Sequence, residues 1–104
     1  MAVIEVTKEN FEAEVLRSEV PVLADFNADW CGPCRSMRPM LDELAEEQDS
    51  FKIVSINIDD EDELTDEYDV SSIPCLVVFK GGEEVNRSVG LIPKDAIAAL
   101  AVAG

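Results

Sequence analysis

The chain has 104 residues, 47 % of them apolar, and a formal net charge of −15, a profile typical of one globular domain with a real core. The acidic excess disfavours phosphate backbones and anionic lipids, so we expect neither nucleic-acid binding nor membrane association. No apolar run is long enough for a membrane-spanning helix, and the first residues show no signal-peptide pattern. The absence of histidine removes the commonest general base and metal ligand.

The first quarter of the chain predicts two strands joined by a helix. Residues 4–6 are typical of a short strand, and the apolar run 21–27 is typical of a strand buried on both faces. Thr7 is expected to cap the helix between them. The apolar face of that helix would hold Phe11, Val15 and Leu16.

The middle of the chain continues the alternation of strand and helix. A long helix is expected after Cys31, with apolar residues at helical spacing, and Pro39 should kink it. Residues 51–58 predict a strand. The acidic stretch 59–69 contains a short helix with apolar residues at helical spacing.

The last third predicts an antiparallel hairpin followed by a helix. Gly81-Gly82 is a two-residue turn signal between the strands 75–79 and 85–89, and residues 93–103 have a helical apolar face. The preceding strand-helix alternation implies parallel pairing. The sequence therefore predicts an α/β fold, a mixed sheet covered by helices on both sides.

Cys31-Gly32-Pro33-Cys34 carries the most specific chemistry in the chain. Cysteines at this spacing on a helical turn lie within disulfide reach, with Cα atoms about 5–6 Å apart. Because Cys31 would sit at a helix N-terminus, its thiolate should be stabilised, whereas Cys34 should be more buried and have a higher pKa. Two alternatives stay open: a metal site, which with Cys75 has at most three thiolates, and an inert local disulfide.

Asp25 lies in the apolar run 21–27, where an unpaired charge is expensive. If the carboxyl group is buried, its pKa should be raised and it could carry a proton near neutral pH. Alternatively, it reaches water at the end of the strand. Spacing alone does not separate the two interpretations.

The ordered set of motifs resembles the thioredoxin family over essentially the whole chain. The segments that carry the resemblance are Ala24-Asp25-Phe26, Trp30-Cys31-Gly32-Pro33-Cys34, Pro39, Asn57-Ile58-Asp59, Ile73-Pro74, Phe79-Lys80-Gly81-Gly82 and Val89-Gly90. The resemblance implies a thioredoxin fold, a central mixed five-stranded β-sheet flanked by four α-helices, as one domain over residues 1–104.

The resemblance also implies an activity, a protein-disulfide reductase acting in the cytoplasm. Cys31 would attack a substrate disulfide, Cys34 would resolve the mixed disulfide, and Asp25 would assist proton transfer at Cys34. The remaining matches to the substrate-binding rim are Trp30, Gly32, Pro33, Ile73, Pro74, which would be a cis-proline, and Gly90. Gly90 is alternatively a bend or bulge in the last strand. No organic cofactor or metal is implied, and the implied partners of this monomer are a thioredoxin reductase and disulfide-containing proteins.

Three positions depart from the family pattern. Arg35 replaces the usual Lys after the motif, which keeps the charge. Ser55 stands where many members carry a Lys that pairs with the buried acid, so we expect Asp25 to have a higher pKa. Cys75 replaces the usual Thr after the proline; it is interpreted either as a buried near-isostere or as a third thiol open to oxidation or to a disulfide with Cys31.

The distribution of acidic residues predicts an exposed charged surface, and two alternative functions can be weighed against disulfide reduction. The helix around residues 42–49 and the stretch 59–69 together hold 13 acids, which predicts a solvated face, and either adaptation to high salt or steering toward a basic partner. A disulfide oxidant or isomerase is disfavoured by Gly32-Pro33 and by the missing signal pattern. A non-catalytic thioredoxin-fold binding subunit would not need the intact cysteine pair.

Overall fold

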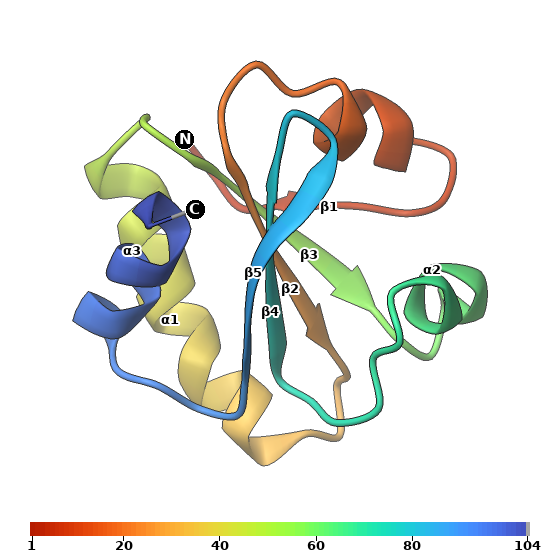
Figure 1. The fold of residues 1–104 in the computed structure, drawn as a ribbon. Helices are drawn as coiled ribbons and strands as arrows, with labels where there is room; N and C mark the ends of the chain where they lie inside the picture. Colours follow the sequence, from red (N-terminus) through yellow and green to blue (C-terminus); the bar gives the residue numbers. More distant parts are fainter. Residues whose placement is uncertain (104) are drawn as a thin grey trace.

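A computed structural model describes residues 1–103 and contains one five-stranded sheet in the order β1-β3-β2-β4-β5 (Figure 1). Each strand forms where the sequence has an apolar or alternating run. The strands are β1 (Ile4–Glu5), β2 (Val22–Asn27), β3 (Lys52–Asn57), β4 (Cys75–Lys80) and β5 (Glu83–Val89). All five agree with the predicted strands to within a few residues.

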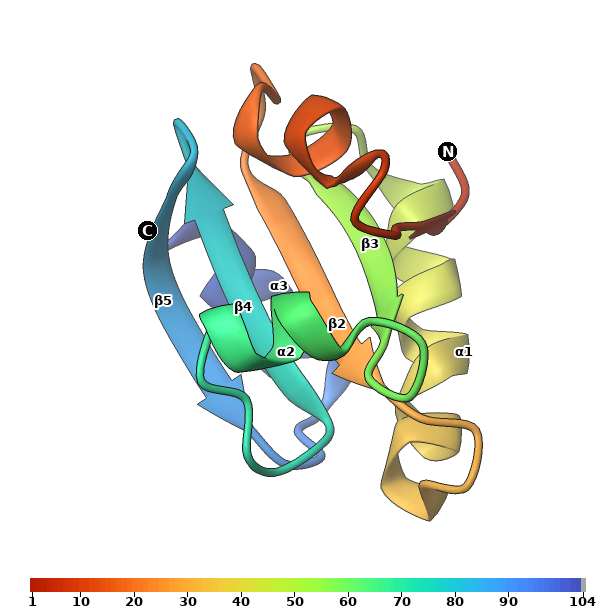
Figure 2. The ribbon, with the colours of Figure 1, turned by 90° about the vertical axis from the view of Figure 1, so that its right-hand side faces the viewer.

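Helices cover both faces of the sheet (Figure 2). They are the π-helical turn η1 (Glu12–Leu16) and the α-helices α1 (Gly32–Glu47), α2 (Asp62–Glu67) and α3 (Lys94–Val102). Helices α1 and α3 pack on one face, and η1 and α2 lie on the other. The predicted thioredoxin fold, a mixed sheet between helices, is confirmed.

Strand direction brings three chain segments to one edge of the sheet. Strand β3 runs parallel to both β1 and β2, so β2 and β3 end at the same edge, where Asn27 pairs with Asn57. Strand β4 runs antiparallel to β2 and begins at that edge, where Cys75 pairs with Phe26. The cysteine motif after β2 and the Ile73-Pro74 segment before β4 therefore meet there.

Alternation along β2 divides the core into two layers. Leu23 packs with Met37 and Leu41 of α1, whereas Ala24 and Phe26 pack on the side of η1 and α2. Because successive side chains point to opposite faces, Asp25 shares the α1 side with Leu23. The sheet thus aims one carboxylic acid toward the helix that carries the cysteines.

The helix predicted after Thr7 begins later than expected. Helical backbone starts only at Phe11, which precedes η1, and Thr7 does not cap the helix. Instead the Thr7 backbone N–H donates to Oδ1 of Asn10 at 2.7 Å, and its hydroxyl donates to Glu9. A local side-chain to backbone bond at Asn10 competes with the helical ladder and delays the helix.

The hairpin between β4 and β5 turns at the predicted glycines. Gly81 and Gly82 both have positive φ, 60° and 82°, which is the backbone that a two-residue turn between twisted strands requires. A Cβ atom on Gly82 would also lie 3.0 Å from the carbonyl oxygen of Leu16. A larger residue there would be strained by the positive φ and by its contact with the Leu16 carbonyl oxygen.

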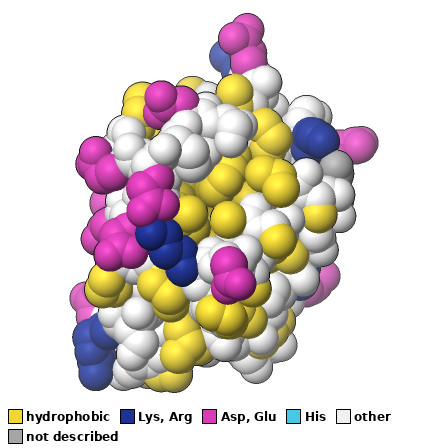
Figure 3. Space-filling view, turned by 90° about the vertical axis from the view of Figure 1, so that its left-hand side faces the viewer, with side chains coloured by type: hydrophobic (Ala, Val, Ile, Leu, Met, Phe, Trp, Pro, Cys, Tyr) yellow, Lys and Arg dark blue, Asp and Glu magenta, His cyan; other side chains and the backbone are white. Residues whose placement is uncertain are grey.

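The acidic side chains lie mainly at the surface. Figure 3 views the side that carries α1 and α3, where hydrophobic side chains gather in the middle and acidic ones border them. Lys94 of α3 lies 3.1 Å from Glu43 and 2.5 Å from Glu47 of α1, which links the two helices. Within residues 1–103, every helix is too short or too polar to cross a membrane.

Candidate active site

Cys31 and Cys34 form a disulfide at the start of α1. Cys31 is the N-cap residue of the helix, with extended φ and ψ, and Gly32 and Pro33 begin its first turn. The two Cα atoms lie 5.2 Å apart, within the range predicted from the spacing. Proline is well suited to this first turn because its missing N–H would have no helical partner there.

The helix N-terminus acts directly on the Cys31 sulfur. Its Sγ accepts a hydrogen bond from the Cys34 backbone N–H at 3.2 Å, as a capping side chain does. In the reduced protein that bond and the helix dipole favour a thiolate at Cys31. The expected difference in burial is not found, since Cys31 is 5 % exposed and Cys34 is 4 % exposed. Both cysteines are covered, since Ile58 and Ile73, from other segments, pack against the cluster that contains them.

Asp25 is buried, with 2 % of its surface exposed, which excludes the interpretation that it reaches bulk water. Its nearest neighbours across the sheet are Ser55 on β3 and Leu76 on β4. One carboxyl oxygen, Oδ2, lies 3.4 Å from the amide nitrogen of Asn27, while buried Oδ1 has no hydrogen-bond partner among the described residues. Burial raises the pKa of Asp25 to about 7, partly offset by the positive charge of Arg38.

A cleft of about 280 Å³ connects Asp25 with Cys34. Its lining residues are Asp25, Asn27, Ala28, Asp29, Cys34, Arg35 and Arg38. A polar cleft of this size has room for water molecules. Asp25 and Cys34 can therefore exchange a proton through water without direct contact.

The Ile73–Pro74 peptide bond is cis, as the family resemblance implies. Ile73 packs against the cluster formed by Ala28, Cys31 and Cys34, which places this loop beside the disulfide. The carbonyl oxygen of Pro74 accepts a bond from the Gly90 backbone N–H at 2.8 Å. Gly90 follows β5 with φ of 100°, so the bend predicted for it is confirmed, and its hydrogen bond places it next to Pro74.

Exposed apolar side chains adjoin Cys31 and Gly90 in the chain. Trp30 is 66 % exposed, and its indole N–H donates to the Asp59 carboxylate at 2.9 Å. Val89 and Leu91, on either side of Gly90, are also exposed. These two residues were not predicted from the sequence, although large apolar side chains that flank a glycine after a strand are a usable signal of an exposed rim.

Cys75 lies in the apolar layer between the sheet and η1. It is 1 % exposed and packs in the cluster that contains Val77 and Phe79, whereas Cys31 and Cys34 form a separate cluster. Burial raises the pKa of its thiol, which lowers its reactivity. These observations favour the near-isostere interpretation over the third-thiol hypothesis.

Two further polar residues of the cleft were also not predicted. Asn27 donates from its amide nitrogen to the Ser55 hydroxyl at 2.8 Å and to the Asp25 backbone carbonyl at 2.9 Å. Arg38 lines the same cleft from α1. Their spacing was the available signal: Asn27 lies two residues after Asp25 on a strand, and Arg38 lies four residues after Cys34 on a helix.

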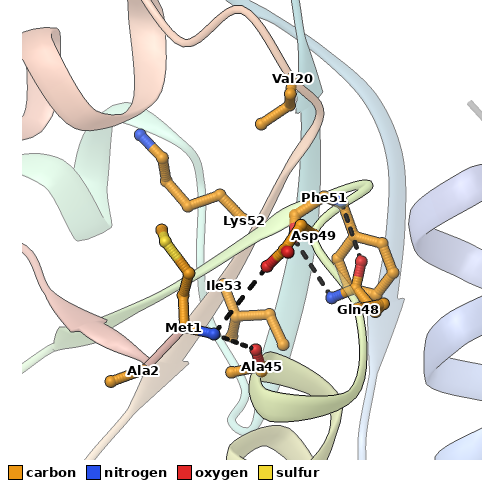
Figure 4. A pocket seen from close by; sticks show the side chains of 9 residues that line it. All are labelled: Met1, Ala2, Val20, Ala45, Gln48, Asp49, Phe51, Lys52 and Ile53. Carbon is orange, nitrogen blue, oxygen red and sulfur yellow. Dashed lines mark hydrogen bonds and ion pairs between the residues drawn. The ribbon is translucent and has the colours of Figure 1, made fainter.

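A second pocket, of about 290 Å³, lies at the opposite edge of the sheet, where β3 begins (Figure 4). It is mostly apolar and includes Ala45, Phe51 and Ile53. The Met1 amino group is already bonded there, 2.7 Å from the Ala45 carbonyl oxygen. Neither cysteine of the motif lines this pocket, so we place the chemistry at the Cys34 cleft. Within residues 1–103, no three His, Cys, Asp or Glu side chains converge as a metal site would need.

Comparison with known proteins agrees with this geometry. The family model described as Thioredoxin matches residues 2–103. The chain is 48 % identical to a thioredoxin of Pyropia yezoensis over 94 % of this chain and 92 % of that protein. It is 49 % identical to a thioredoxin of Bacillus subtilis over 93 % and 92 % of the two chains.

A solved structure of a mutant thioredoxin from Halobacterium salinarum NRC-1 superimposes with a TM-score of 0.90 at 35 % identity. The match covers 98 % of this chain and 89 % of that one. Fold, motif and relatives agree. The chain therefore belongs to the thioredoxin family, and it is a disulfide oxidoreductase whose redox-active dithiol motif is Cys31-Gly32-Pro33-Cys34.

Proposed function

We propose that this protein, as one domain over residues 1–104, reduces disulfides of protein substrates in the cytoplasm and is returned to its dithiol form by a thioredoxin reductase. The observation that carries the proposal is the Cys31–Cys34 disulfide at a helix N-terminus, with buried Asp25 on the same cleft. A bond that closes a loop of only four residues constrains the unfolded chain little, which suits a bond that is made and broken.

The proposed reaction begins with the Cys31 thiolate. It attacks one sulfur of a substrate disulfide, a mixed disulfide forms, and the other substrate sulfur leaves as a thiolate that takes up a proton. Cys34 then gives its proton to the Asp25 carboxylate through the cleft and attacks the Cys31 sulfur. The Cys31–Cys34 bond forms, the second substrate thiol leaves, and two electrons have passed to the substrate.

The environment of Asp25 supports its role as the proton acceptor. An efficient general base has a pKa near the working pH, and burial raises the pKa of Asp25 to about 7. A carboxyl group at its usual pKa would be too weak a base for a buried thiol. Thiols and one carboxyl group account for every proton and electron, so the reaction needs no organic cofactor or metal.

We assign substrate binding to the segments around the cysteines, in which Trp30 and Pro33 are exposed and Pro74 is buried. The proposed residues are Trp30, Gly32, Pro33, Ile73, Pro74 and Gly90. An apolar rim with backbone groups at its edge suits an extended peptide segment better than a small polar molecule. We expect the protein to work as a monomer, because a second copy of the chain docked on this surface would cover Trp30 and keep substrates away.

The test is dithiothreitol-driven reduction of insulin disulfides, followed by the turbidity of the released chains. We expect the wild-type protein to accelerate the reaction, Cys31→Ser to abolish the acceleration, and Cys75→Ser to retain most of it. Equal acceleration by Cys31→Ser would contradict the proposal. A wild-type protein that binds the substrate without reducing it would instead indicate a non-catalytic binding subunit.

A further inference from the structure

The cross-strand neighbours of Asp25 bring no charge to its carboxyl group. On β3 the neighbour is Ser55, whose hydroxyl accepts from Asn27, and on β4 it is Leu76. Any cation that stabilises the ionised carboxyl group must come from another element.

Arg38 places a cation on the cleft that Asp25 lines. It is four residues after Cys34 on α1, so both side chains lie on one helix face, and both line the cleft that contains Asp25. Two carboxylates hold its guanidinium group: Glu5 of β1 at 3.2 Å and Asp42 of α1 at 3.1 Å. The side chain is 39 % exposed, so solvent also reaches it.

We propose that Arg38 is a positioning residue that favours the ionised form of the Asp25 carboxyl group, and so its ability to accept a proton, at neutral pH. Glu5 and Asp42 fix the guanidinium group and share its charge, which limits its effect on Asp25. The inference rests on the proposed function, in which Asp25 accepts the proton of Cys34.

The other polar groups around Asp25 do not fill this role. Arg35 lines the cleft too, but its guanidinium group donates to the backbone carbonyl of Asp29 at 2.9 Å. Asn27 of β2 and Ser55 of β3 are uncharged, and Asp29 in the loop and Glu5 of β1 are acidic. The positive charge of Arg38 lowers the pKa of Asp25 against the effect of burial, and Glu5 raises it.

The test is an NMR titration of the Asp25 side-chain carboxyl carbon in the oxidised protein. In Arg38→Gln the midpoint should rise by roughly half to one pH unit. An arginine that paired with Asp25 alone would have a larger effect, but the charge of Arg38 is also partly neutralised by Glu5 and Asp42. Arg38→Lys should restore most of the wild-type midpoint. Arg35→Gln removes the same charge from the same cleft and should shift the midpoint by less than half as much.

Glu5→Gln provides a test of opposite sign. It removes a negative charge near Asp25 and frees Arg38 from one partner, so the midpoint should fall. A variant that only loosened the packing of α1 would not produce opposite shifts for Arg38→Gln and Glu5→Gln. An Arg38→Gln midpoint equal to that of the wild-type protein would overturn the inference, and so would equal shifts for Arg35→Gln.

The pH profile of insulin reduction separates this inference from the proposed function. The lower midpoint of the rate should move upward in Arg38→Gln, in parallel with the NMR midpoint. If the wild-type protein reduces insulin but Arg38→Gln leaves the profile in place, the inference fails and the proposed function stands. If the wild-type protein does not reduce insulin, the proposed function fails, and the NMR midpoints still decide whether Arg38 sets the charge of Asp25.

Discussion

Replacing the buried acid by its neutral isostere, Asp25→Asn, should stabilise the oxidised protein at alkaline pH. Burial raises the pKa of Asp25 from 3.8 to about 7 in the folded protein, so between these pH values the folded state binds more protons than the unfolded state. Its stability therefore falls as the pH rises through this window. A rise of about three pH units corresponds to about 4 kcal/mol by the top of the window.

The assay is urea unfolding of the oxidised wild-type and Asp25→Asn proteins across the upper part of the window. From about pH 5.5 to about pH 8.5, the stability of the variant relative to the wild type should increase by about 2 kcal/mol. The reason is that about half of the window between the unfolded and folded pKa values of Asp25 lies above pH 5.5. The comparison between variants cancels the titration of the other acids.

Asp60→Asn is the matched control, because Asp60 is an exposed acid and its substitution removes one negative charge without emptying a buried site. Its stability relative to the wild type should change little with pH. If the stability of Asp25→Asn relative to the wild type is equally flat over this range, then Asp25 is not a carboxyl group whose ionisation opposes folding. Asp25 would then lack the raised pKa that suits it to accept a proton from Cys34.

The thiols and the net charge give three more expected outcomes. In Cys34→Ser the attacking thiol has no resolving partner, so mass spectrometry should detect a covalent mixed disulfide with a substrate protein; its absence would remove the role given to Cys31. Peptide mapping after mild peroxide treatment should find only the Cys31–Cys34 bond, with Cys75 still a free thiol; a bond to Cys75 would restore the third-thiol hypothesis. Because the net charge is −15, screening should relieve self-repulsion and raise the melting temperature with added NaCl, and a flat response would exclude adaptation to high salt.

The sequence predicts most of the fold because its signals are local and strong. The apolar run before Asn27, the Gly81-Gly82 turn and the helical spacing after Cys31 each depend on neighbouring residues only. The start of η1 was placed wrongly because Thr7 and Asn10 form a side-chain turn that competes with helix capping. Propensity at Thr7 alone does not decide between the two.

The site was less predictable where it depends on packing between distant segments. The cysteine pair followed from spacing, whereas spacing and the apolar context left open whether Asp25 is buried, and only the packed structure decided it. The equal burial of Cys31 and Cys34 could not be predicted, because Ile58 and Ile73 pack against their cluster from segments far along the chain. The place of Arg38 beside the Asp25 cleft likewise requires α1 and β1 to be docked, since Glu5 and Asp42 together hold the guanidinium group.

The reduction potential of the Cys31–Cys34 pair tests the central claim most directly. The protein would be equilibrated in defined dithiothreitol or glutathione buffers, with Trp30 fluorescence as the readout, because this indole adjoins Cys31 in the chain. A general disulfide reductant should have a reduction potential of about −270 mV, the value characteristic of thioredoxin. A value near the roughly −120 to −180 mV of dedicated oxidants and isomerases would contradict the account and assign the protein to disulfide formation or isomerisation.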